Sequence, residues 1–194
     1  MEISVDRERV EAFSQRQFQF YLGYSSFILR ALEKSSFQKF LHWMLKKEKI
    51  DEQIVKVVHI RVLPLKRKSG QGVAGKCAPD RGRIRIYPKT IKFCQIFRQR
   101  FGKNTLFAYA GNRARAALIH ELLHLKYTEE EIVRELAEEY FGFFTQGKSK
   151  ENSQTLQRMI FKTKSGRDSP PNFSTALATP LTADETCLRT SSPL

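Results

Sequence analysis

Two histidines and a glutamate stand at a spacing that suits metal-dependent hydrolysis, namely His120, Glu121 and His124 in an HExxH pattern. On a helix, residues four positions apart project from one face, so both imidazoles can reach one ion. Glu121 lies about 100° round the helix from His120, where its carboxylate can reach a metal-bound water without binding the metal. Zinc lowers the pKa of such a water toward about 7, and Glu121 would take its proton as general base. The pattern predicts one Zn²⁺ per chain and no other cofactor.

A third protein ligand is expected, because catalytic zinc generally takes three side chains and a water. No histidine follows His124, but glutamates recur in the next segment. If that segment is a helix antiparallel to the first, residues equally far from the intervening turn lie side by side. This reasoning favours Glu135 as the ligand, with Glu139 as the alternative and Glu138 third. Glu139 could instead hydrogen-bond a ligating histidine.

Tyrosines near the motif could stabilise the oxyanion that forms when a carbonyl is attacked. Tyr127 and Tyr140 are the candidates, because both lie close to the motif in sequence. Both could equally be packing residues, since tyrosine commonly buries its ring.

The elements around the motif are predicted from periodicity. Residues 54–63 and 82–88 have the β-branched or alternating character of strands, and 90–101 has helical spacing. Asn112 is a plausible N-cap for the histidine helix. After a break near Tyr127, Thr128 with Glu131 suggests a capping box for a helix that ends near residue 144.

Three parts of the chain differ in composition. Residues 1–50 are predicted to form a helical N-terminal segment with breaks at Gly23 and at residues 35–36, and residues 51–145 a zincin-like domain. Residues 146–194 are rich in Ser, Thr, Pro and Lys, which is typical of a disordered tail. The predicted fold class is therefore α+β, with a short sheet packed on the active-site helix and a glutamate helix after it.

Positive charge is concentrated in one stretch of the sequence. Residues 61–118 contain fifteen Lys and Arg against one acid, giving 15 − 1 = +14, while the rest of the chain is balanced. Such a field could attract nucleic acid, anionic membrane or acidic protein, or the charges could simply form a solvated face.

No apolar run is long enough for a membrane span, no signal peptide is evident, and three scattered cysteines suit a reducing compartment. We expect a cytoplasmic protein.

The order of strands, HExxH helix and glutamate helix over about 54–144 resembles the gluzincin metallopeptidases, above all the minimal soluble ones related to catalytic domains of integral-membrane zinc proteases. The resemblance implies zinc, Glu121 as base, and a peptide substrate that binds along an edge strand. Here that edge would be residues 82–87, through main-chain hydrogen bonds. Glu139 stands where the family would have an aspartate, so the ligand assignment departs from its pattern.

Peptide-bond hydrolysis is thus the leading hypothesis, and two alternatives remain. One is a nucleic-acid-associated protease similar to the SprT-like group, which the basic stretch 61–118 motivates. The other is a nucleic-acid-binding module whose metal motif is vestigial.

Overall fold

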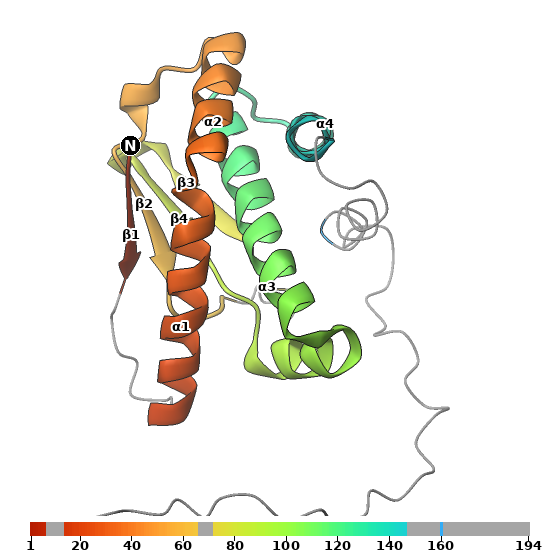
Figure 1. Ribbon diagram of the computed structural model, residues 1–194. Coiled ribbons are helices and arrows are strands. Elements are labelled where there is room, and N and C mark those ends of the chain that lie inside the picture. Colours follow the sequence, from red (N-terminus) through yellow and green to blue (C-terminus); the bar gives the residue numbers. More distant parts are fainter. Residues whose placement is uncertain (7–13, 66–71, 147–159, 161–194) are drawn as a thin grey trace, which may run out of the picture. The chain divides into compact units, whose positions relative to one another are not determined.

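A four-stranded sheet and four helices build the protein in the computed structural model, which describes residues 1–6, 14–65, 72–146 and 160 (Figure 1). The strands are β1 (Glu2–Asp6), β2 (Val57–Arg61), β3 (Gly75–Ala78) and β4 (Arg83–Ile86). The helices are α1 (Gln15–Leu32), α2 (Ser35–Glu48), α3 (Ile91–Leu123) and α4 (Glu130–Thr145). This is the small α+β architecture expected from the sequence.

The sheet is mixed, in the order β1-β2-β4-β3. Strands β1, β2 and β4 are parallel, and β3 runs antiparallel to β4. The prediction that residues 82–87 form an exposed edge is therefore wrong, because β4 is flanked on both sides. The edge nearest α3 is β3, a strand that the sequence did not reveal because Gly75-Lys76-Cys77-Ala78 lacks β-branched residues.

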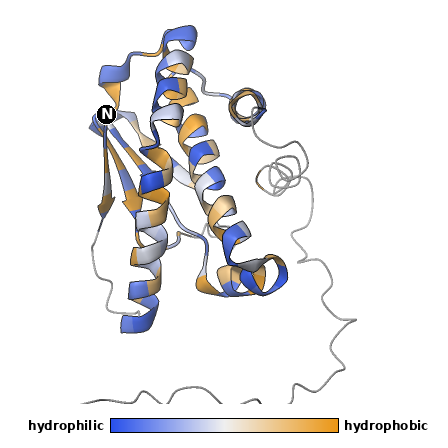
Figure 2. Cartoon of the chain, viewed as in Figure 1, coloured by the Kyte–Doolittle hydropathy of each residue, from blue (hydrophilic) through white to orange (hydrophobic). Residues whose placement is uncertain are grey.

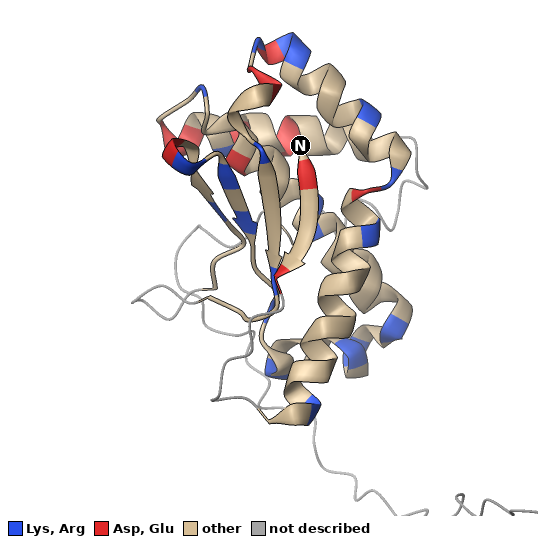
Figure 3. Ribbon diagram, turned by 90° about the vertical axis from the view of Figure 1, so that its left-hand side faces the viewer, with Lys and Arg blue, Asp and Glu red and all other residues tan. Residues whose placement is uncertain are grey.

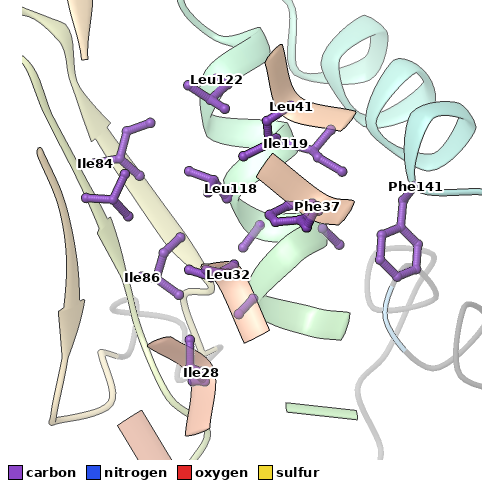
Figure 4. Close-up of a cluster of buried hydrophobic side chains, with 14 of the residues drawn as sticks. Ile28, Leu32, Phe37, Leu41, Ile84, Ile86, Leu118, Ile119, Leu122 and Phe141 are labelled. Atoms are coloured by element: carbon purple, nitrogen blue, oxygen red, sulfur yellow. The ribbon is translucent and has the colours of Figure 1, made fainter. Parts of the chain in front are cut away.

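Helices α1 and α3 cover one face of the sheet (Figures 1 and 2). Ile84 and Ile86 of β4 point from the sheet toward Leu118 and Leu122 of α3, and Leu32 of α1 lies beside them (Figure 4). These side chains are almost fully buried. Because burial alternates along β2 and β4, the intervening residues lie on the opposite face of the sheet.

The N-terminal segment shares this core with the rest of the described chain. Strand β1 pairs with β2, and α1 and α2 contribute buried side chains such as Ile28, Phe37 and Met44. Gly23 lies inside α1 and does not break it, whereas the break near Ser35 is confirmed. Of the predicted tail 146–194, all but residues 146 and 160 lie outside the described residues.

The helix that carries the histidines begins earlier than predicted. Helix α3 starts at Ile91, capped by the Thr90 side chain, and is kinked at Gly102, whose φ of 81° suits glycine. Asn112 is inside this helix and accepts a hydrogen bond from Arg115, so it is not an N-cap. Nor does Thr128 cap α4, whose N-cap is Glu129 without a side-chain hydrogen bond.

Candidate metal centre

The imidazoles of His120 and His124 meet at the C-terminal end of α3. Their Nε2 atoms are 3.1 Å apart, as the four-residue spacing predicts. Both side chains are partly buried, with about a fifth to a quarter of their surface exposed. The end of this helix therefore places two nitrogens that could bind a metal side by side at the protein surface.

The carboxylate that joins the histidines is that of Glu130, the first residue of α4. Its Oε2 lies 3.4 Å from Nε2 of His124 and 3.8 Å from Nε2 of His120. Within the described ranges, these three residues are the group of His, Cys, Asp and Glu that could hold a metal ion. The three donor atoms converge from the end of one helix and the start of the next.

The spacing of the donors can be compared with zinc coordination. A circle through three points separated by 3.1, 3.4 and 3.8 Å has a radius of about 2.0 Å. Zinc binds imidazole nitrogen and carboxylate oxygen at about 2.0–2.2 Å. An ion near the centre of this triangle would thus be within bonding distance of all three donors, so the residues fit zinc.

Glu135 and Glu139, the favoured and alternative third ligands, are not brought to the histidines. Helix α4 crosses α3 at a steep angle, seen end-on in Figure 1, and Glu130 in its first turn is the residue of α4 that joins the group with the histidines. At about 100° per residue, Glu135 is about 140° and Glu139 about 180° round the helix from Glu130. Both are exposed, as is Glu138. The antiparallel arrangement assumed for the prediction does not exist, and Glu130 replaces Glu135 as the candidate ligand.

His124 is oriented through its other ring nitrogen. Its Nδ1 lies 3.3 Å from the backbone carbonyl oxygen of Tyr127, which can only accept a hydrogen bond. The proton of neutral His124 is thereby placed on Nδ1, and the lone pair of Nε2 is left to bind a metal. This backbone contact comes from the turn between the two helices, which sequence periodicity does not describe.

Glu121 is turned toward the sheet and is 8% exposed. A Cβ atom built on Gly75 of β3 would lie 2.6 Å from Cγ and 2.7 Å from Oε1 of Glu121. Glycine at this position therefore makes room for the Glu121 side chain against the strand. Gly75 is a site residue that the sequence reading missed, because only the fold brings it to the helix.

The two tyrosines proposed as oxyanion donors both bond to Glu48 of α2. Tyr127 Oη donates to Glu48 Oε2 over 2.8 Å, and Tyr140 Oη donates to Glu48 Oε1. Lys126 Nζ also donates to Oε2, over 3.0 Å. Burial would raise the pKa of Glu48, but the three hydrogen bonds outweigh it and lower the pKa. Glu48 thus ties α2 to the turn beside His124.

The basic stretch 61–118 serves more than one purpose. Arg113 is buried and donates to the backbone carbonyls of Tyr87 and Val73, and buried Arg115 donates to that of Ala31. Others are exposed or partly exposed on the strands and exposed near the start of α3 (blue in Figure 3). Part of the charge therefore stabilises the fold and is not available to a partner.

No protein-family model, curated protein or solved structure matches this chain significantly. None of the described helices is long and apolar enough to cross a bilayer.

Proposed function

We propose that this protein is a zinc metallopeptidase of the gluzincin-like type, with His120, His124 and Glu130 as its metal ligands. The observation that carries the proposal is the triangle of donor atoms, whose sides of 3.1, 3.4 and 3.8 Å suit a single zinc ion. Glu121 follows the first ligand in an HExxH pattern, in the position of a general base.

Each residue would have a distinct role. When bound, zinc would supply Lewis acidity, which activates water and polarises a carbonyl. Glu121 would accept a proton from the attacking water and deliver it to the leaving amine. Its low exposure and its position against Gly75 limit the directions in which the carboxylate can turn. The Tyr127 carbonyl would keep His124 in the metal-binding tautomer.

A peptide substrate would bind at β3, the edge strand beside Glu121. Edge strands offer unpaired backbone groups, to which an extended peptide can add as another strand. The close approach of Glu121 to Gly75 would then place the base next to the bound peptide. This replaces the earlier expectation that residues 82–87 supply the edge.

Metal content and activity together test the proposal. The purified protein should hold one zinc per chain and cleave an unstructured protein such as casein. His120→Ala should lose both the zinc and the activity. Glu121→Ala should keep the zinc and lose at least about a hundredfold in rate, as expected for a general base. A chain that binds no zinc, or a Glu121→Ala variant that is fully active, would overturn the proposal.

A second candidate function is binding to nucleic acid, alone or with proteolysis. The observation in its favour is the N-terminal part of α3, around its kink at Gly102, where Lys92, Arg98, Arg100 and Lys103 are all exposed. No acidic residue occurs between Asp80 and Glu121 to offset them. Lys and Arg that contact phosphates release counterions, so binding should weaken steeply with salt.

Titration of duplex and single-stranded DNA at several salt concentrations tests this candidate. Affinity should fall by orders of magnitude between about 50 and 200 mM salt if several phosphates are contacted. The double variant Arg98→Glu/Arg100→Glu should bind more weakly and with a smaller salt slope. Absence of binding at the lowest salt would exclude the candidate.

A further inference from the structure

The outer edge of β3 presents the backbone groups of alternate residues. The Tyr87 N–H donates to the Ala74 carbonyl over 2.9 Å, so alternate residues beyond this pair bond inward to β4. The backbone groups of Gly75 and Cys77 consequently face outward. A peptide strand added here would pair with these two residues.

Lys76 lies between them and projects to the sheet face that α1 and α3 do not cover. Gly75 faces Glu121 on the helix side, and successive residues of a strand point to opposite faces. Lys76 is accordingly exposed, and it stands directly opposite Arg85 of β4. Arg83 lies two residues from Arg85, on the same face.

These three cations have no acidic partner in the part of the chain that the structure describes, where the ion pairs involve other residues. Like charges directly opposite each other on neighbouring strands are destabilising. An anionic group placed over Lys76 and Arg85 would relieve this repulsion. The open side of the β3 edge is therefore complementary to acidic side chains.

We propose that the β3 edge selects extended peptides with Asp or Glu on the strand face beside Lys76, with Arg85 as a second contact. This inference rests on the proposed function, of which it specifies the substrate class. Alternate side chains of the added strand would lie on the open face, next to Lys76, while the others would face α3. Acidic residues should therefore be favoured at every second position close to the scissile bond.

The test is binding of labelled peptide pairs to the full chain in the presence of a chelator, which prevents cleavage. One peptide carries Asp and Glu at alternate positions, and its twin carries Asn and Gln there. The acidic peptide should bind about two- to fivefold more tightly for each acidic residue that is placed opposite a cation. Lys76→Glu should invert this preference, and Lys103→Glu, the same charge change on α3, should retain it.

Equal binding of the two peptides, or an unchanged preference in Lys76→Glu, would overturn the inference. Tighter competition by a single-stranded oligonucleotide of equal charge, lost in Lys76→Glu, would also overturn it and assign this surface to nucleic acid. Hydrolysis is measured separately with zinc restored. If neither peptide is cleaved but the acidic preference holds, the proposed function fails and the surface assignment stands.

Discussion

Replacing Glu48 with leucine tests whether this buried carboxylate holds the turn beside the candidate metal centre. Leucine is similar in size but accepts no hydrogen bond. Glu48 is 8% exposed and accepts from Tyr127, Tyr140 and Lys126. The variant therefore leaves three donors without their acceptor, and the cost depends on which of them can reach water.

The cost can be estimated donor by donor. Tyr140 is 3% exposed, so its hydroxyl would be buried and unpaired, which costs about 1–3 kcal/mol of stability. Tyr127 is partly exposed and can turn to water, so its loss is about 1 kcal/mol. The side chain of Lys126 is 41% exposed and contributes little. The free energy of unfolding should fall by about 3 kcal/mol, which lowers the Tm by roughly 6–12 °C for a domain of this size.

Thermal and urea unfolding of the metal-free protein measure this change. The double variant Glu48→Leu/Tyr140→Phe removes both partners of the buried bond, so it should recover part of the loss. Glu52→Ala, whose carboxylate contacts His42 at the surface, is the control and should stay within about 0.5 kcal/mol. A Glu48→Leu variant as stable as wild type, or no recovery in the double variant, would refute the reasoning.

The same carboxylate makes the free energy of unfolding depend on pH. The pKa of Glu48 is lower in the folded protein than its ordinary value, so the carboxylate stabilises the fold fully above the unfolded pKa of about 4.3. That stabilisation is lost as the pH falls through the lower, folded pKa. The stability difference between wild type and Glu48→Leu should hence shrink in acid, as unfolding at several pH values would show.

Three further predictions follow from the site and its support. Gly75→Ala should push the Glu121 side chain aside and reduce peptidase activity at least about tenfold, while zinc content and Tm change little, as assay and metal quantification would show. Glu130→Gln should weaken zinc binding at least about tenfold in a chelator competition, whereas the matched variant Glu135→Gln on the same helix should not. Arg113→Met should lower the unfolding free energy by about 2–4 kcal/mol, because a buried and a partly buried carbonyl lose their charged donor.

The sequence predicted those parts of the protein that depend on local periodicity. The fold class, strand β2, the extent of α4 to about residue 144 and the pairing of the two histidines all follow from patterns within a few residues. Strand β1 was missed because it becomes a strand by pairing with β2, more than fifty positions away. For this terminal segment, tertiary pairing decides the structure more than intrinsic preference does.

The structure brings Glu130 to the histidines in place of the predicted Glu135 for a different reason. Distance from the turn indicates Glu135, but the position of a ligand also depends on the angle at which α4 leaves that turn, and this angle is set by how α4 packs on α3 and α2. The same holds for Gly75 and Glu48, which approach the site from β3 and α2. Nothing in the spacing of HExxH indicates such partners, because they are set by the fold.

The three candidate ligands lie within ten positions of one another, from residue 120 to 130. Donors this close in sequence remain close in an unfolded chain, which can therefore hold a metal ion weakly before it folds. Any affinity of the unfolded state for zinc subtracts from the stability that zinc adds to the native state. Zinc should consequently raise the Tm by less than its affinity for the folded protein implies, and a nascent chain could acquire the ion before its sheet is assembled.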